Sequence, residues 1–442
     1  MLVIRAHCRL KLKGGSRGMA LHCWWLAALI LMVLAACAPS AGLTSLPDQS
    51  PSPAPVVSSQ ERTTGQPAKP LATPTLADPP SSSPAPVPMV DVSLHDVPLE
   101  DIVFDTFGGS PRFVALSAAS EELILDLRDA IAPVAQPVYG GPGALPWLED
   151  THLVMGYRSD DSAFAYPINV MNRHEIVNDV IDGVPLAVTY CPLCFSGVVF
   201  SREMDGRLLT FGNTSALYQS DMVMYDHQTG SYWFQVGGEA VVGAMTGARL
   251  SLLPSTTMEW GDWRRLNPET QVLAGTARDP ERFAAPTYQS GIPASYQTQI
   301  NRERFAFPVD ENKLDTRLAA GEIVVTVETG NGAKAYPLGL IGDGAVNDSV
   351  AGTPVVVLAQ DSRRAAAAFS PVTPGPDGFA LLFDYSEDRQ AFVDRETGSA
   401  WDLGGMATEG PLAGVQLKPL NTRRAFWFSI AIAFPGIDVY IP

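Results

Sequence analysis

The sequence predicts a mainly β protein built from two tandem homologous β-rich domains with a few short helices. Three observations lead to this fold class: an internal repeat, stretches in which apolar and polar residues alternate, and Asp-Gly pairs between apolar runs. Alternation with a period of two is typical of half-buried strands, and Asp-Gly favours tight hairpin turns. A chain of 442 residues exceeds what a single hydrophobic core usually holds, so more than one domain is expected.

The N-terminal segment, residues 1–36, has the pattern of a lipoprotein signal peptide. It contains five Lys or Arg residues and no acid, and an uncharged run fills residues 19–36. This run leads into "LAAC" (residues 34–37), which resembles the bacterial lipobox and implies cleavage before Cys37 with lipid on its sulfur. The alternative is an uncleaved anchor helix, because the run is near the length that spans a bilayer. Both interpretations place the rest of the chain outside the cytoplasm, held at a bacterial membrane.

Residues 37–95 are predicted to form a stalk between this membrane anchor and the folded part. The segment is rich in Pro, Ser and Ala, with 13 prolines in residues 38–88, and such a composition buries too little apolar surface to fold. Removing residues 1–36 changes the formal net charge from −17 to −22, because five positive charges leave. This acidity argues against nucleic acid as a partner and leaves a small-molecule or protein partner open.

An internal repeat defines the two predicted domains, residues 96–285 and residues 286–442. Three stretches of the first domain return in order in the second, at offsets between 168 and 172 residues. The pairs are "AFAYPINVMNRHEIVNDVIDGVPLAVTY" with "AKAYPLGLIGDGAVNDSVAGTPVVVLA", "MDGRLLTF" with "PDGFALLF", and "DHQTGSYW" with "DRETGSAW". The pairs Asp205-Gly206 and Asp377-Gly378 predict a tight hairpin in each copy. A helix is expected at about 117–131, and the apolar residues 425–434 are too few to span a membrane and are expected in the core.

A comparison of the two copies separates residues that maintain the fold from residues with a specialised role. Both copies contain the same turn and core residues, namely Tyr166/Tyr336, Asn178/Asn347, Asp179/Asp348, Asp226/Asp394, Thr229/Thr397, Gly230/Gly398 and Trp233/Trp401. Such Asn, Asp and Thr side chains can satisfy local backbone groups, so we assign them to the fold. The first copy alone contains His174, Glu175, Cys191 and Cys194, which stand opposite Asp343, Gly344, Gln360 and Arg363.

The cysteines of the predicted folded part lie together in one short motif. Cys8 and Cys23 belong to the predicted leader and Cys37 is the predicted lipid site, so Cys191 and Cys194 alone remain in the folded part. One close pair does not make a disulfide scaffold. The motif "YCPLC" therefore calls for a chemical explanation.

The stretch around this motif resembles a known bacterial family. "HEIVNDVIDGVPLAVTYCPLC" (residues 174–194), followed by "LTFGNTSALYQSDMVMYDHQTGSYWFQVGG" (residues 209–238), is similar to the domain of unknown function family 3179. The resemblance extends over about residues 101–440. It supplies no mechanism, because the family has no established activity.

The first hypothesis for the motif is a metal site made by Cys191, Cys194 and His174. Two cysteines three residues apart with a histidine are common in zinc sites, and soft thiolate ligands also suit copper. A fourth ligand would come from water or from one of Glu175, Asp179, Met222, Met224, Asp226 and His227. Glu175 and Asp179 are also expected to support the ligands from behind by hydrogen bonding.

Two other hypotheses stay open, and with them the question whether the protein is an enzyme. Secreted Cys-x-x-Cys pairs can exchange electrons, which would make the protein a thiol–disulfide oxidoreductase. Against this, the thioredoxin arrangement needs its first cysteine at the start of a helix, whereas "FSGVVF" has the pattern of a strand. The third hypothesis is a non-catalytic binding or structural module in which the pair is a small disulfide or two buried thiols.

Overall fold

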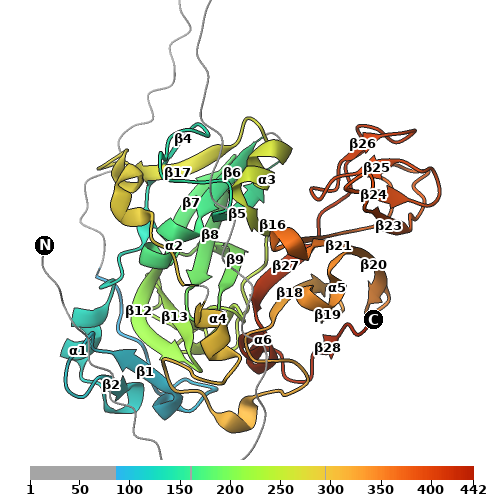
Figure 1. Ribbon diagram of the computed structural model, residues 1–442. Coiled ribbons are helices and arrows are strands. Elements are labelled where there is room, and N and C mark those ends of the chain that lie inside the picture. The colour runs from blue at the N-terminus through green and yellow to red at the C-terminus, as the bar shows by residue number, and fades with distance from the viewer. Residues whose placement is uncertain (1–85, 160–161, 294) are drawn as a thin grey trace, which may run out of the picture. The chain divides into compact units, whose positions relative to one another are not determined.

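The computed structural model describes residues 86–442 except 160–161 and 294, and these residues form a mainly β structure (Figure 1). The predicted fold class is confirmed in this respect. The predicted signal peptide, Cys37 and most of the predicted stalk lie outside the described residues. Residues 86–95 belong to the predicted stalk and are described. Within them Val90 is buried, and the carbonyl of Pro88 accepts a hydrogen bond from Arg128.

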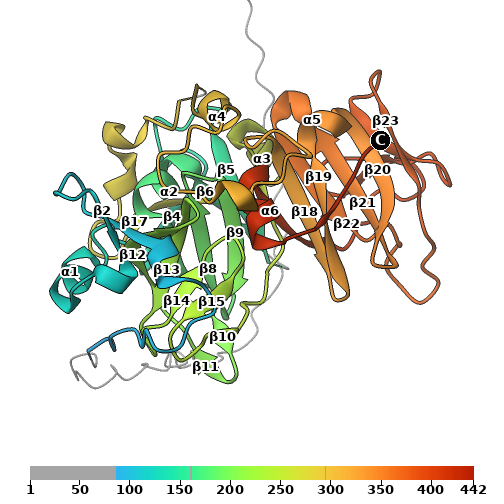
Figure 2. The ribbon, with the colours of Figure 1, turned by 90° about the horizontal axis from the view of Figure 1, so that it is seen from below.

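The largest sheet has eight strands in the order β28-β19-β18-β27-β9-β8-β7-β3. Its strands come from both predicted domains (Figure 2). They are β3 (Val134–Ala135), β7 (Ile176–Ile181), β8 (Val184–Cys191), β9 (Ser196–Ser201), β18 (Ile323–Thr329), β19 (Gly332–Pro337), β27 (Asn421–Phe426) and β28 (Asp438–Val439). The link between the domains is the antiparallel pair of β27 and β9, where Arg424 lies opposite Gly197.

A second, six-stranded antiparallel sheet contributes to the same core as this large sheet. Its order is β15-β14-β13-β12-β1-β2. The strands are β1 (Ile102–Asp105), β2 (Phe113–Ala115), β12 (Phe211–Tyr218), β13 (Asp221–Asp226), β14 (Tyr232–Phe234) and β15 (Glu239–Val242). Ala187 and Val198 of the large sheet share a hydrophobic cluster with Phe211 and Val223 of the six-stranded sheet. The space between β8–β9 and β12–β13 is therefore core, and it contains the candidate site.

Four smaller sheets complete the β structure. One has five strands in the order β16-β5-β6-β17-β4, and the others have three, four and two. Their strands are β4 (Pro137–Gly140), β5 (Leu153–Arg158), β6 (Ala163–Pro167), β16 (Ser255–Glu259) and β17 (Gln271–Thr276); β20 (Asp343–Val350), β21 (Thr353–Gln360) and β22 (Ala365–Phe369); β23 (Phe383–Ser386), β24 (Ala391–Asp394), β25 (Ala400–Trp401) and β26 (Ala407–Glu409); and β10 (Glu203–Met204) and β11 (Arg207–Leu208).

The helices of the described residues are short. They are α1 (Glu121–Leu127), α2 (Ile168–His174), α3 (Trp260–Leu266), α4 (Ser295–Ile300), α5 (Leu338–Ile341) and α6 (Trp427–Ala433), with 3-10 turns at η1 (Leu99–Asp101), η2 (Leu116–Ala118), η3 (Arg282–Ala284), η4 (Pro286–Tyr288), η5 (Glu311–Lys313) and η6 (Asp361–Arg363). Helix α1 lies inside the predicted helix and begins after Ser120, whose hydroxyl accepts a bond from the Leu123 N–H. Helix α6 is largely buried, as expected for residues 425–434. Among the described helices, none has the length and apolar character to cross a membrane.

The two predicted Asp-Gly hairpins have different outcomes. Asp205 and Gly206 have φ values of 49° and 73° between the paired strands β10 and β11, which confirms the first hairpin. The second prediction is wrong in its mechanism, because in that loop the positive φ falls on Gly375, at 109°. Gly378 is needed for close approach, since a Cβ there would lie 2.3 Å from the Thr373 carbonyl oxygen. In the second copy the turn is therefore set by Gly375, which lies just before the matched segment.

Several residues common to both copies make the same contacts twice. Asp226 accepts bonds from the Thr229 N–H at 2.6 Å and the Trp233 indole at 3.0 Å, and Asp394 accepts them from Thr397 at 2.6 Å and Trp401 at 2.8 Å. Likewise Asn178 and Asn347 each exchange two bonds with a backbone, that of Phe211 or Phe383. These paired contacts support the repeat prediction and the assignment of these residues to the fold.

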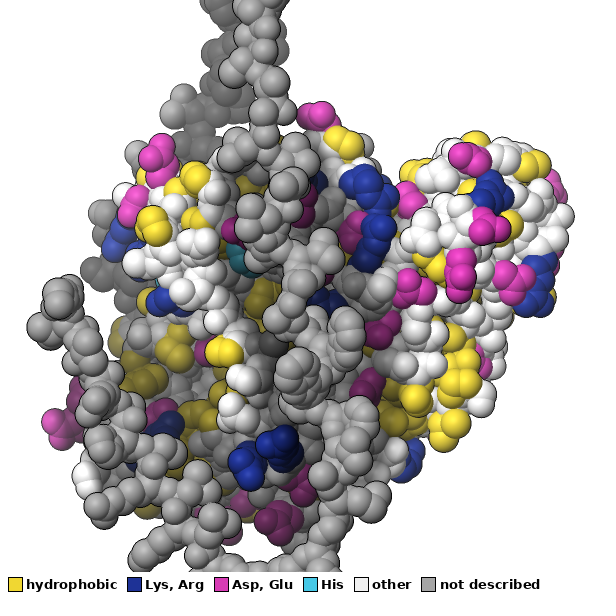
Figure 3. Space-filling view, in the orientation of Figure 1, with side chains coloured by type: hydrophobic (Ala, Val, Ile, Leu, Met, Phe, Trp, Pro, Cys, Tyr) yellow, Lys and Arg dark blue, Asp and Glu magenta, His cyan; other side chains and the backbone are white. Residues whose placement is uncertain are grey.

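The charged side chains on the face shown in Figure 3 are interspersed. Lys and Arg lie among Asp and Glu on this face of the described residues. The excess of acidic residues in the sequence is therefore not gathered into one patch on this face.

Candidate functional site

The motif "CPLC" forms the turn between strands β8 and β9. Cys191 is the last residue of β8 and lies opposite Ser196, the first residue of β9. The turn closes with Phe195 at a φ of 53°. Two later segments cover it: the Tyr296 hydroxyl donates to the Leu193 carbonyl at 2.8 Å, and the Phe426 N–H donates to the Cys194 carbonyl at 2.8 Å. Residues from the second predicted domain thus hold the cysteine turn in place.

Asp221 faces the cysteines from the other sheet. It begins strand β13 directly after a two-residue hairpin turn, Gln219-Ser220, whose φ values of 52° and 62° are those of a type I′ turn. Asp221 is fully buried, and its two oxygens accept bonds from the N–H groups of Met222 at 2.8 Å and Val236 at 2.9 Å. Its carboxyl is therefore fixed by backbone groups before any ligand binds.

Cys191, Cys194 and Asp221 form what we call the thiol–carboxylate cluster. One atom from each, a sulfur or a carboxylate oxygen, lies within 4.8 Å of the other two, and all three residues are buried. The Cys194 thiol donates to Asp221 Oδ1 at 2.8 Å, and neither cysteine is in a disulfide. Behind them the Ser196 hydroxyl lies 3.2 Å from Cys194 Sγ and donates to Gln235 Oε1 at 2.5 Å. The bond to Gln235 fixes the orientation of the Ser196 hydroxyl, which is the group that contacts the Cys194 sulfur.

Glu175 lies beside this cluster. It follows the last residue of helix α2 with a φ of 58°, and its carboxylate accepts a bond from the Asn213 side-chain amide at 2.7 Å. Burial, reinforced by the negative charge of Asp221, raises the pKa of the Glu175 carboxyl to about 8. The same carboxyl contributes to the raised pKa of the Cys191 thiol.

The cluster and Glu175 are buried acidic groups whose pKa values are all raised. Burial raises the pKa of Cys191 to about 11 and the pKa of Asp221 to about 6, and it also raises the pKa of Cys194. Within the described part of the chain, neither Asp221 nor Glu175 forms an ion pair with Lys, Arg or His. A bound cation would reverse this penalty, because a positive charge favours the ionised form of each group.

Some residues around the cluster have a left-handed backbone, as do nine non-glycine residues elsewhere in the described chain. Five residues other than glycine have φ between 52° and 62° there: Glu175, Phe195, Ser215, Gln219 and Ser220. A left-handed conformation costs a residue with a Cβ about 1 to 2 kcal/mol.

His174, a predicted ligand, is not part of this group. Its Nδ1 lies 2.8 Å from the Ala132 carbonyl oxygen and its Nε2 lies 3.0 Å from the Tyr288 hydroxyl. The carbonyl requires Nδ1 to carry the proton, so Nε2 accepts from Tyr288 and neither nitrogen is free. The ring stacks on Tyr288, and burial lowers its pKa. His174 and Glu175 are therefore neighbours in sequence only. Glu175 has a left-handed backbone, which turns its side chain toward a different environment from that of His174.

Asp179 also lies elsewhere. Its carboxylate accepts bonds from the hydroxyls of Tyr139 and Tyr166, the latter at 2.7 Å. Tyr336 and Asp348 of the second copy make the same type of bond at 3.1 Å. This repetition assigns Asp179 to the fold, in agreement with the comparison of the two copies and not with a supporting role behind the cysteines.

Sequence reasoning found the two cysteines and missed Asp221. The repeat gives no clear signal for Asp221, because the hairpin that carries it is four residues shorter in the second copy. The offset between the copies falls from 172 at Phe211 and Phe383 to 168 at Asp226 and Asp394. Asp221 therefore has no single counterpart in the second copy.

The fold and this geometry define a β protein with a buried thiol–carboxylate cluster between two sheets. The chain belongs to the family described as Protein of unknown function (DUF3179), whose model matches residues 128–436. This confirms the resemblance seen in the sequence. No curated protein and no solved structure matches the chain.

Proposed function

We propose that this chain binds one soft or borderline metal ion, zinc or copper, through Cys191, Cys194 and Asp221. The observation that carries the proposal is the approach of two sulfurs and a carboxylate oxygen to within 4.8 Å of one another in the core. Thiolates and carboxylates both bind zinc, and thiolates also select Cu(I). Asp221, in place of His174, is the third ligand of this proposal.

Metal binding would exchange weak contacts for strong ones. Both thiols lose their protons, because the thiolate is the ligand. The bond from the Cys194 thiol to Asp221 is then replaced by bonds from both residues to one cation. The backbone N–H groups that hold Asp221 stay in place, so this carboxylate is oriented in advance.

Glu175 is the candidate for a fourth ligand, with water as the alternative. Its carboxyl acts electrostatically on Cys191 and is affected in turn by Asp221. The bond from Asn213 holds it in place. Its oxygens are not within 4.8 Å of all three ligand atoms of the cluster, so the side chain would have to move to bind the ion. A tetrahedral zinc site with two sulfur and two oxygen ligands would result.

The geometry favours metal binding over thiol–disulfide exchange. A reactive cysteine needs exposure and a lowered pKa, because the thiolate is the nucleophile. Here Cys191 and Cys194 are 1% and 0% exposed, and burial raises the pKa of both. A redox role would require the turn to open, and three bonds or stacking contacts from Tyr296 and Phe426 oppose this.

We also propose how the chain is organised and where the protein is located. The first domain (residues 96–285) carries the site and the second (residues 286–442) is a copy without it, since Gln360 and Arg363 stand where the first has its cysteines. Lipid on Cys37 would hold the protein at the outer face of a bacterial membrane. Mass spectrometry of the mature N-terminus tests this: an unmodified Cys37 would contradict it.

Elemental analysis with thiol counting tests the metal site. The full chain is purified without a His tag under anaerobic conditions, and about one equivalent of zinc or copper is expected. Cys191→Ser and Asp221→Asn should each lower metal affinity by at least tenfold, because each removes one ligand. His174→Gln is the matched control and should keep its metal.

The outcomes separate the hypotheses. No metal together with a readily reducible disulfide would contradict the proposal and establish the redox alternative. No metal and two unreactive thiols would establish a structural role for the pair. Loss of metal from His174→Gln, with Asp221→Asn unaffected, would restore the ligand set expected from sequence.

A further inference from the structure

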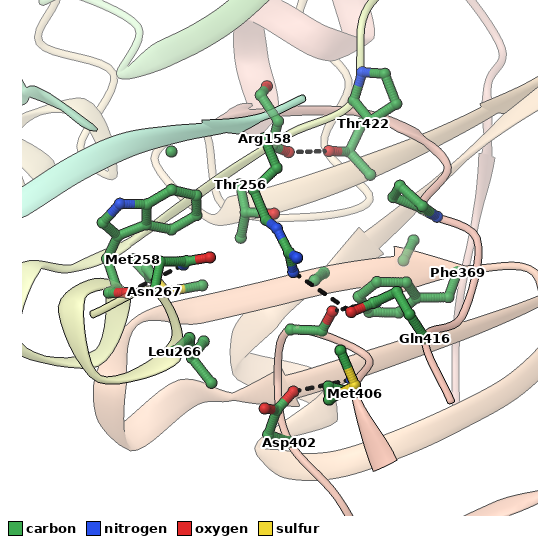
Figure 4. A pocket seen from close by; sticks show the side chains of 18 of the residues that line it. Arg158, Thr256, Met258, Leu266, Asn267, Phe369, Asp402, Met406, Gln416 and Thr422 are labelled. Atoms are coloured by element: carbon green, nitrogen blue, oxygen red, sulfur yellow. Dashed lines mark hydrogen bonds between the residues drawn. The ribbon is translucent and has the colours of Figure 1, made fainter. Parts of the chain in front are cut away.

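A cavity of about 300 Å³ lies away from the thiol–carboxylate cluster, where the two predicted domains meet (Figure 4). One side is formed by β5, β16 and α3 of the first domain. The other is formed by β22 and by residues 402–422 of the second. The volume is at the lower end of the range for small-molecule sites, and such sites occur preferentially at domain interfaces.

The wall of this junction cavity is mainly apolar. Met258, Trp263, Leu266, Phe369 and Met406 contribute to it. The Trp263 ring occupies the space next to Gly156, where a Cβ would lie 2.1 Å from the ring. The glycine thus allows the indole to pack closely against β5.

Arg158, which is an exposed residue, supplies the positive charge of the cavity, and Asp402 in the same wall supplies a negative charge. Figure 4 shows its side chain extending across the cavity toward Gln416. Among the described residues its guanidinium makes a single hydrogen bond, from Nη1 to Gln416 Oε1 at a long 3.4 Å, and no ion pair. A guanidinium has five N–H donors, so most of them are left for water or a ligand. By contrast Arg265 and Arg363 both pair with Asp262 nearby.

The other polar groups of the wall are already engaged with the protein. The Gln416 amide donates to the carbonyls of Gly404 at 2.8 Å and Leu417 at 3.1 Å, which fixes its oxygen toward Arg158. Asp402 accepts from the Met406 N–H at 3.0 Å, and its carboxylate also interacts electrostatically with Arg158. The Thr422 hydroxyl donates to the Ser255 carbonyl at 2.9 Å. Arg158 is therefore the cationic group of the wall that can meet an acidic ligand, which has to compete with Asp402 for it.

We propose that this cavity binds a small organic carboxylate with an apolar body. The carboxylate would take the paired donors of Arg158, since a guanidinium matches a carboxylate in a two-point contact. The apolar body would lie against Trp263, Phe369 and the methionines. The site depends on both domains and is independent of the metal proposal, because it shares no residue with the thiol–carboxylate cluster.

Isothermal titration of the full chain with 3-phenylpropionate and with 3-phenyl-1-propanol tests the proposal. The acid is expected to bind at least tenfold more tightly than the alcohol, because charge-assisted bonds to Arg158 are worth a factor of this size. Arg158→Gln should remove this preference and leave the alcohol unaffected. Leu266→Ala should weaken both probes.

The controls keep the test decisive. Arg389→Gln removes an exposed arginine that pairs with Glu409 outside the cavity lining, and it should bind both probes as the wild type does. Thermal unfolding checks that each variant folds, and Arg158→Lys, with intermediate affinity expected, replaces Arg158→Gln if that variant does not. Equal binding of acid and alcohol, an unchanged Arg158→Gln, or no saturable binding of either probe would overturn the proposal.

Discussion

Asp221 has a combination of properties that few carboxylates share: it is fully buried, it is held by two backbone N–H groups, and it touches a thiol. Burying an ionised group without a cation is costly, so the protein keeps protons on the cluster when no metal is bound. The stability of the metal-free protein should therefore depend on pH, and a bound metal should remove this dependence.

This pH dependence has a definite sign. The pKa of Glu175 is raised from 4.5 in the unfolded chain to about 8 in the folded metal-free protein, so between these values the folded state holds a proton that the unfolded state has released. Stability of the metal-free protein is therefore expected to fall as pH rises from about 5 to 8, by roughly 3 to 4 kcal/mol. Urea unfolding across this range measures it. In Glu175→Gln the fall should be smaller; an unchanged slope would contradict the assignment.

At the same scale, the sequence predicted two of the three cluster residues. Cys191 and Cys194 were found because a local spacing rule applies to them. Asp221 is 27 residues beyond Cys194 and reaches the cluster from another sheet, which no spacing rule captures. His174 was chosen for its nearness along the chain, and the left-handed Glu175 directs it to a different environment.

At the scale of elements, the turn before β13 determines where Asp221 lies. Gln219-Ser220 adopts a type I′ turn without the Asn-Gly sequence that such turns favour, and the Ser220 hydroxyl is buried with no partner in the described structure. This turn escaped sequence analysis because its residues carry no turn signal. Asp205-Gly206 was found because its residues do, and Asp377-Gly378 showed that the same dipeptide can serve close packing instead.

Ser220→Gly is expected to stabilise the protein by about 0.5 to 1 kcal/mol, because glycine adopts a positive φ without steric cost and removes an unsatisfied hydroxyl. Ser220→Ala is the matched variant, since it removes the hydroxyl and keeps the strained Cβ. It should therefore stabilise less than glycine does. Thermal and urea unfolding measure both changes, and a Ser220→Gly variant less stable than Ser220→Ala would show that the turn is not strained.

At the scale of the whole molecule, the two predicted domains share one sheet. The pairing of β27 with β9 joins segments more than 200 residues apart, and sequence periodicity cannot reveal such a pairing. The alternating patterns and the repeat predicted the strands, because those signals are local or recur along the chain. The order of strands in the eight-stranded sheet depends on long-range packing, which only the structure supplies.

The shared sheet predicts that residues 96–285 do not fold by themselves. This fragment lacks β27, the Phe426 ring that stacks on Phe195 at 4.8 Å, and Tyr296 over the cysteine turn. Circular dichroism and size-exclusion chromatography should show loss of cooperative unfolding or aggregation, and the fragment should retain no metal. A folded, metal-loaded monomer of this length would mean that the second domain is dispensable for the site.

The central claim is that Cys191, Cys194 and Asp221 hold one metal ion, and X-ray absorption at the metal edge of the purified full chain tests it most directly. For zinc, the account predicts two sulfurs at about 2.3 Å with oxygen ligands at about 2.0 to 2.2 Å and no imidazole scattering. Asp221→Asn should change the light-atom shell, and His174→Gln should leave the spectrum unchanged. Imidazole scattering that disappears in His174→Gln, or a protein without metal, would contradict the account.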